Sequence, residues 1–258
     1  MKTRWRILSG LSVALLCMAG ARVSADDGSR ICKTETDPGG IAIPYQLFIP
    51  PNYDKSIHYP LVVCFHGSGE MKRPDYEAVT AASTALLKPD VREKYPAFIL
   101  VPQTKIGWAT VNKEERMAIV KGVPEAIPMK LSLKIIGDVM SEYSIDADRL
   151  YVTGQSMGGV ATWDIIVRHP DQFAAAVPIC GFGDLTEAAK IRCPVWVFHG
   201  AKDHVVPVAC SRDMVDAMKQ AGGSVKYTEY PDVDHGSWTP AWKEAELVPW
   251  LFAQHRPK

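Results

Sequence analysis

Residues 151–159 read Tyr-Val-Thr-Gly-Gln-Ser-Met-Gly-Gly, an apolar strand pattern that runs into Gly-Gln-Ser-Met-Gly. Leu150–Thr153 has the composition of a buried strand, and apolar residues recur at helical spacing over 160–167. The pattern Gly-x-Ser-x-Gly is weakly specific by itself, but a strand before it and a helix after it are typical of a nucleophile elbow. Such a turn presents a serine hydroxyl to a base. The sequence therefore predicts Ser156 as a nucleophile.

A serine nucleophile needs a histidine base and an acid that orients the histidine, in the chain order Ser, Asp/Glu, His for this architecture. Asp203 comes just after the apolar segment Val195–Phe198, and His235 follows the strand-like segment Val225–Tyr230. Both positions fall at carboxyl ends of strands, where parallel sheets place their chemistry. We predict Asp203 as the acid and His235 as the base.

Competing residues have simpler interpretations. Asp232 and Asp234 are the alternative acids, but they lie so close to His235 in sequence that a turn-forming role is favoured. His66 and His199 each precede a glycine at a strand end, where an imidazole commonly braces a loop. The remaining histidines lie in loops, at a helix end or in the tail: His58, His169, His204 and His255.

The oxyanion of a tetrahedral intermediate needs backbone N–H donors, one of them from the residue after the nucleophile. Met157 is that residue. The glycine-rich loop Phe65–Glu70 follows a strand and offers the second donor, which we assign to Ser68. A glycine turn that binds no ligand is the alternative for this loop, and Glu70 is interpreted as a structural carboxylate.

The rest of the chain alternates strand and helix patterns. A polar stretch runs to Gly40, and strands are expected within 41–49, 61–65, 98–101, 150–153, 175–179, 195–198 and 225–230. Helices are expected within 75–87, 128–143, 160–169 and 208–221. This order predicts an α/β fold with a mostly parallel central sheet and helices on both faces. Residues 108–127 are the least regular part, either an insertion that shapes the substrate pocket or an ordinary surface connection.

Residues 1–25 have the pattern of a secretory signal peptide. Lys2, Arg4 and Arg6 precede an apolar run, and Val23-Ser24-Ala25 forms a small-residue cleavage site. The run is short for a bilayer span, so a membrane anchor is disfavoured, and the bulky residue before Cys17 disfavours lipidation. We expect cleavage, no stable membrane span afterwards, a secreted or periplasmic location, and one catalytic domain over 26–258.

Charge and cysteine content set further limits. Residues 1–25 hold four of the 29 basic residues and none of the 29 acidic ones, so the mature chain would have a formal charge of −4. Nothing in this balance points to nucleic acid. Five cysteines remain after residue 25, and an odd number leaves at least one unpaired, most simply Cys64 in its apolar strand. The other four could form up to two disulfides, with no pairing specified.

The sequence resembles the α/β-hydrolase superfamily over essentially the whole mature chain. The resemblance rests on 66–70, 146–159, 196–203 and 235–238, which look like secreted carboxylesterases near the polyhydroxybutyrate depolymerase, feruloyl esterase and phospholipase/carboxylesterase groups. Members of those groups are cofactor-free serine hydrolases. The resemblance therefore implies the triad Ser156, Asp203 and His235, an acyl-enzyme intermediate, no cofactor and no catalytic metal.

Related sequences often have a Pro-Gln pair followed by a tryptophan near the pocket. Pro102-Gln103 and Trp108 match this pattern, although the spacer lacks the usual cysteine, which leaves the acyl or leaving-group pocket open. Trp108 and Trp238 are the candidate substrate-binding residues because indole rings stack on aromatic or sugar-bearing groups, and simple packing is the alternative for both.

The expected activity is hydrolysis of a small-molecule or polymer-borne carboxylic ester. A secreted serine peptidase of the prolyl oligopeptidase type is one alternative, although such enzymes generally carry a large additional domain. The other is a catalytically silent, ligand-binding member of the fold, since fold alone does not establish activity. The natural ester, the oligomeric state and the choice between periplasm and cell exterior are left open.

Overall fold

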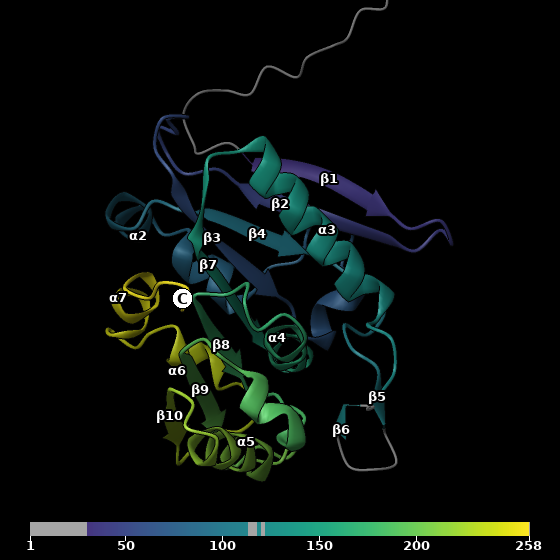
Figure 1. The fold of residues 1–258 in the computed structure, drawn as a ribbon, viewed down its shortest axis with the longest axis vertical. Coiled ribbons are helices and arrows are strands. Elements are labelled where there is room, and N and C mark those ends of the chain that lie inside the picture. Colours follow the sequence, from purple (N-terminus) through teal and green to yellow (C-terminus); the bar gives the residue numbers. More distant parts are fainter. Residues whose placement is uncertain (1–29, 113–117, 120–121, 258) are drawn as a thin grey trace, which may run out of the picture.

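The computed structural model describes residues 30–112, 118–119 and 122–257. They form one eight-stranded sheet with the strand order β1-β2-β4-β3-β7-β8-β9-β10 (Figure 1). Its strands are β1 (Arg30–Thr36), β2 (Ala42–Phe48), β3 (Tyr59–Phe65), β4 (Phe98–Pro102), β7 (Ile145–Gln155), β8 (Ala175–Ile179), β9 (Val195–Gly200) and β10 (Val225–Tyr230). The strands from β4 to β10 in this order are parallel, and β2 is antiparallel to β1 and β4. The predicted α/β fold is confirmed.

Helices cover both faces of this sheet (Figure 1). One core cluster packs α3 (Ile127–Glu142), α4 (Met157–Arg168) and α5 (Ala209–Gln220) against one face. A second cluster packs α1 (Ala81–Leu86), α6 (Trp238–Ala241) and α7 (Leu247–Phe252) against the other, with α2 (Pro89–Lys94) beside it. Two 3-10 helices, η1 (Ser68–Lys72) and η2 (Leu185–Lys190), follow β3 and β8. None of the described helices is long and apolar enough to span a bilayer.

Burial explains which strands the sequence predicted well. Every residue of β3, β4, β8 and β9 is buried, because helices cover both sides of the sheet, and these strands accordingly read as continuous apolar runs. The edge strand β1 was not expected within the polar stretch that ends at Gly40. No residue of β1 is buried, so its sequence carries charged side chains and lacks the pattern of a core strand.

The helix expected over 75–87 is much shorter, and this prediction was wrong in its start. Thr80 begins α1 with a reciprocal capping box: its hydroxyl accepts from Ser83 N at 2.9 Å, and the Ser83 hydroxyl accepts from Thr80 N at 3.0 Å. Residues before Thr80 form the loop that follows η1. Pro89 then starts α2 at a first-turn position, where its missing N–H costs nothing.

The disulfides that the cysteine count allowed are not formed. All five cysteines after residue 25 are free thiols. Cys64, Cys180 and Cys193 pack as small apolar groups in the core, and burial raises the pKa of each thiol to about 12. Cys17 and the whole of residues 1–25 lie outside the described residues, so the cleavage of a signal peptide stays a prediction.

The close approach of α4 to β3 depends on Gly158. A Cβ atom at this position would overlap the backbone carbonyl of Phe65 and come within 2.9 Å of His66 O. Both obstacles are backbone atoms at the end of a central strand and cannot rotate away. We expect Gly158→Ala to lower the free energy of unfolding by about 2–3 kcal/mol, the usual cost of overpacking, as measured by urea titration.

Gly137 provides the matched control. It lies inside α3, and apart from the backbone of its own helix nothing lies within 4 Å of the place that a Cβ would take. Gly137→Ala should raise the free energy of unfolding by about 0.5–1 kcal/mol, because alanine favours the helix and restricts the unfolded chain. Equal effects of the two substitutions would contradict the proposed close contact between α4 and β3.

Candidate active site

Ser156 lies on the sharp turn between β7 and α4, as the sequence predicted. Its backbone has φ 54° and ψ −117°, a region that residues with side chains rarely adopt. The turn is held by Ser156 N, which donates to Ile179 O at 2.9 Å, and by Ser156 O, which accepts from Val160 N at 3.0 Å. A Cβ at Gly154 would overlap the backbone of Gly158, so the turn requires glycine there. The hydroxyl is thereby placed at the carboxyl end of the sheet.

His235 links Ser156 to Asp203 in one chain of hydrogen bonds. Its Nε2 lies 2.8 Å from Ser156 Oγ, and its Nδ1 lies 2.8 Å from Asp203 Oδ2. A carboxylate only accepts hydrogen bonds, so Nδ1 carries the proton and Nε2 is left to accept the serine hydroxyl. The three residues come from loops after β7, β9 and β10, and the fold brings all three predicted residues together.

The carboxylate of Asp203 is fixed on both oxygens. Oδ1 accepts from Val205 N and Val206 N, each at 2.8 Å, while Oδ2 faces His235. The side chain is fully buried, whereas 19% of the His235 side chain is exposed. The two backbone donors hold the orientation of this carboxylate. Asp203 is therefore sheltered, and His235 is open to a ligand.

The competing acids lie elsewhere. Asp232 pairs with Lys202 at 2.7 Å, and its side chain is 85% exposed. Asp234 accepts from the backbone N–H of His235 at 2.7 Å and of His204 at 3.2 Å. The contacts of Asp234 are those of a turn-forming residue, as predicted, whereas Asp232 makes a surface ion pair.

The two backbone amides predicted to bind an oxyanion both begin helices. Met157 is the first residue of α4, and Ser68 is the first residue of η1. N–H groups in a first helical turn have no partner within their helix and remain available to an anion. Glu70 lies beside this loop, with Oε2 3.4 Å from where a Cβ on Gly67 would be, and burial raises the pKa of Glu70. Its position fits the structural role expected for it.

Trp108 packs against the backbone that leads to Ser68. This placement differs from the predicted contact with substrate. The indole is fully buried, so it offers no surface to a ligand in this structure. Its Nε1–H donates to His66 O at 3.1 Å, and its ring packs on Phe65 with a centroid distance of 4.9 Å. The distance in sequence between Pro102-Gln103 and Trp108 could not predict that the indole is buried.

His66 braces the same loop, as expected for a histidine before a glycine. Its Nε2 accepts from Thr104 N at 3.0 Å, so Nδ1 carries the proton and donates to Gly67 O at 2.7 Å. Burial lowers the pKa of His66 to about 4, which keeps the ring neutral. The backbone just before Ser68 is therefore held by hydrogen bonds from the side chains of His66 and Trp108, and by the packing of Phe65 on Trp108.

Trp238 is partly exposed and lies beside the base. Its ring stands nearly perpendicular to that of His235, at a centroid distance of 5.3 Å. Of the two predicted substrate-binding tryptophans, Trp238 alone is placed where it can contact a bound molecule. Its role as a substrate contact stays a prediction.

Residues 108–127 contribute a small hairpin near the site. β5 (Val111–Asn112) pairs with β6 (Ala118–Ile119), and Ile119 packs with Val160, Phe182 and Val206. Val160 belongs to the first turn of α4 and Val206 to the loop that holds the acid. Residues 113–117 and 120–121 lie outside the described part, so a role in shaping the pocket stays a prediction.

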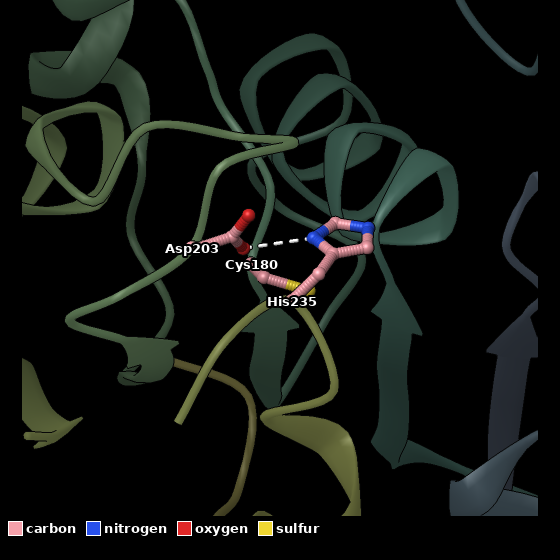
Figure 2. A group of neighbouring side chains, drawn as sticks. All are labelled: Cys180, Asp203 and His235. Carbon is pink, nitrogen blue, oxygen red and sulfur yellow. Dashed lines mark hydrogen bonds and ion pairs between the residues drawn. The ribbon is translucent and has the colours of Figure 1, made fainter. Parts of the chain in front are cut away.

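Cys180 lies against the acid and the base (Figure 2). One ligand atom from each of Cys180, Asp203 and His235 lies within 4.8 Å of the others, a grouping that could in principle hold a metal ion. However, Nδ1 of His235 and Oδ2 of Asp203 are already bonded to each other, and burial raises the pKa of the Cys180 thiol to about 12. This thiol therefore packs as a small apolar group. The donor set fits an acid-base pair better than a resident metal.

The sequence profile of the dienelactone hydrolase family matches residues 93–244, which include Ser156, Asp203 and His235. The chain belongs to this family. It is therefore a hydrolase with the α/β-hydrolase fold, which confirms the resemblance noted from the motifs.

Individual relatives agree with this assignment. The chain is 24% identical to poly(3-hydroxyalkanoate) depolymerase C of Paucimonas lemoignei over 83% of its own length and 56% of the depolymerase. The crystal structure of a thermostable esterase matches 88% of this chain and 63% of its own, with 37% identity and a TM-score of 0.79. The feruloyl esterase module of Clostridium thermocellum matches 90% of both chains at 18% identity and a TM-score of 0.65, which supports the fold alone. The chain thus spans less than two thirds of the depolymerase and of the thermostable esterase.

Proposed function

We propose that this protein is an exported carboxylic ester hydrolase in which Ser156 is the nucleophile, His235 the base and Asp203 the acid. The observation that carries the proposal is the continuous hydrogen-bond chain from Ser156 Oγ through both ring nitrogens of His235 to Asp203 Oδ2, with each bond at 2.8 Å. This is the arrangement that activates a serine hydroxyl.

The reaction proceeds in two halves. Ser156 Oγ attacks the ester carbonyl carbon while its proton moves to His235 Nε2, and the tetrahedral oxyanion accepts hydrogen bonds from the amides of Met157 and Ser68. The carbon–alkoxide bond then breaks, and the alkoxide leaves with the proton from Nε2. Water adds to the acyl-enzyme by the same steps and releases the carboxylic acid. Asp203 stabilises the imidazolium in both halves, and no cofactor or metal is required.

The relatives support a substrate class for this site. Relatives named as a polyhydroxyalkanoate depolymerase and a thermostable esterase support a small-molecule or polymer-borne ester. We further propose that residues 1–25 direct export to the periplasm or the cell exterior, and that residues 26–258 form a single catalytic domain.

Labelling with a fluorophosphonate tests the proposal directly. The mature protein should react stoichiometrically at Ser156, as located by peptide mass mapping, and should release p-nitrophenol from short acyl esters. Faster cleavage of the p-nitroanilide with the same acyl group would favour a peptidase. A folded protein without labelling would indicate a silent member of the fold.

The two tryptophans should differ in their kinetic effects. We expect Trp238→Ala to raise KM for aryl esters about threefold to tenfold relative to alkyl esters, because an exposed aromatic contact is lost. Trp108→Phe should leave this ratio unchanged but lower the free energy of unfolding by about 1–2 kcal/mol, because His66 O loses its buried donor. Initial rates on paired aryl and alkyl esters measure the ratio. A changed ratio in Trp108→Phe would restore the direct-contact interpretation.

A further inference from the structure

A second serine–histidine pair lies behind the acid. His199 is the penultimate residue of β9 and Ser211 lies in α5, and both side chains are fully buried. His199 Nδ1 lies 2.7 Å from Ser211 Oγ, while its Nε2 lies 3.0 Å from Val206 O and 3.2 Å from Asp203 Oδ2. The position of His199 before a glycine at a strand end predicts that it braces a loop. The structure shows that this loop is the one that holds Asp203.

The partners of His199 assign its proton. A backbone carbonyl and a carboxylate only accept, so the proton lies on Nε2, and Nδ1 accepts from the hydroxyl of Ser211. Burial lowers the pKa of His199, which keeps the ring neutral with this single N–H. Ser211 therefore holds the unprotonated Nδ1 of His199, while the protonated Nε2 faces Val206 O and Asp203.

Asp203 consequently lies between two imidazole rings. His235 Nδ1 approaches Oδ2 at 2.8 Å from the ligand side, and His199 Nε2 approaches the same oxygen at 3.2 Å from the core side. Val206 ties the arrangement together, because its N–H donates to Asp203 Oδ1 and its carbonyl accepts from His199. Loss of the His199 N–H would release both the loop and one side of the carboxylate.

We propose that His199 is a positioning residue for Asp203, with Ser211 holding the His199 ring through Nδ1, so that the pair sets the orientation and basicity of His235. The proposal rests on the catalytic roles proposed for Ser156, His235 and Asp203. A donor beside Oδ2 takes up part of the carboxylate charge, which leaves less to stabilise the imidazolium form of His235. Without that donor, His235 holds its proton more tightly and becomes free as a base only at higher pH.

Three variants test this proposal. His199→Phe keeps the ring shape but removes both nitrogens, and we expect kcat per titrated active site to fall about 10- to 100-fold, with KM changed less than about twofold. His199→Gln places an amide N–H near the position of Nε2 and should recover most of this loss. Ser211→Ala should lower kcat in the same direction but less. Ser132→Ala, which removes another fully buried hydroxyl in α3, is the matched control and should keep the original kcat.

The pH profile separates positioning from a general loss of packing. The acid limb of kcat/KM reports the pKa of the free base, and activity falls as pH drops through it. We expect this limb to move to higher pH in His199→Phe and Ser211→Ala, but not in His199→Gln or Ser132→Ala. A general structural defect would lower the number of active sites that react with a fluorophosphonate, but it would not move the acid limb of the pH profile.

Two other ionisable groups near Asp203, Cys180 and Glu229, do not change their charge over the pH range of the kcat/KM profile. Burial keeps the thiol of Cys180 protonated, with its pKa raised to about 12. Glu229 in β10, whose register partner is His199, bonds to Arg212, which lowers the pKa of Glu229 to about 2. Both groups keep one charge state between about pH 5 and pH 9.

His204 precedes Val205 in the acid loop and is exposed over 76% of its side chain, where it pairs with Asp234. It is present in every variant. Any effect of its side chain is therefore common to all profiles.

A double-mutant cycle decides whether His199 acts through Asp203. In an Asp203→Asn background, His199→Phe should lower kcat by less than about twofold, because the residue it positions is already disabled. The proposal is overturned if the two losses multiply, or if His199→Phe and Ser211→Ala keep the original kcat and acid limb. If His199→Phe fails to fold, Ser211→Ala and His199→Gln decide the question. Failure of the proposed function would appear separately, as absence of fluorophosphonate labelling in the unmodified protein.

Discussion

Ser156→Ala is expected to lower kcat by about 10⁵- to 10⁶-fold while the protein stays folded. The loss is this large because the hydroxyl forms the covalent bond to the acyl group, and no neighbouring group can replace it at the end of the chain from His235. Residual turnover would come from the oxyanion donors and from binding alone.

The folded state should change little. Alanine keeps a Cβ on the unusual backbone of Ser156, so the turn is strained to the same degree as in the original protein. Only the hydrogen bond to His235 is lost, and we expect the free energy of unfolding to change by less than about 1 kcal/mol.

Single-turnover and steady-state release of p-nitrophenol, together with urea unfolding, measure both effects. Ser141→Ala removes an exposed hydroxyl from α3 that bonds within its own helix, and it should keep the original rate. A rate for Ser156→Ala within tenfold of the original, in a preparation free of unmodified protein, would refute the role of Ser156 as nucleophile.

The hydrogen-bonded arrangement of Ser156, His235 and Asp203 could be predicted because its sequence signals are local. Ser156 is marked by the glycines that its turn requires, Asp203 follows a buried apolar strand, and His235 follows a strand in which polar and apolar residues mix. Parallel strands bring the loops at their carboxyl ends to one edge of the sheet. The order of the three residues in the chain was therefore enough to predict that they lie close together.

The supporting residues could not be predicted because their roles depend on distant packing. Trp108 sits under a loop that begins about forty residues earlier, and nothing in its neighbourhood indicates that the indole is fully buried. Ser211 reads as an ordinary polar residue of an amphipathic helix, yet its hydroxyl faces inward and fixes a buried imidazole. Such contacts join elements that sequence periodicity describes only separately.

Asp203→Asn should lower kcat by about 10⁴-fold, and the reason lies in the two backbone donors to Oδ1. Val205 N and Val206 N both need an acceptor there, so the amide oxygen of asparagine must take that position. The NH₂ group then replaces Oδ2 and points at His235 Nδ1. Two donors cannot face each other, and the imidazole must shift its proton to Nε2.

That shift removes the base. With its proton on Nε2, His235 can donate to Ser156 but cannot accept the serine proton, although the positions of the heavy atoms are nearly unchanged. Initial rates on a p-nitrophenyl ester, normalised to folded protein, measure the loss. The slower rate should be accompanied by equally slow fluorophosphonate labelling, because both reactions need the same proton transfer.

Asp232→Asn is the matched control for this change. This substitution also replaces a carboxylate by an amide, three residues before His235. The Asp232 side chain is 85% exposed and paired with Lys202, so the rate of ester hydrolysis should stay within about twofold of the original. If both variants kept the original rate, the acid would not be Asp203. If Asp232→Asn alone lost activity, the base would be oriented from its own loop, and the buried carboxylate would serve only to hold residues 203–206. The two results thus assign the acid by function, independently of the distances that place Asp203 next to His235.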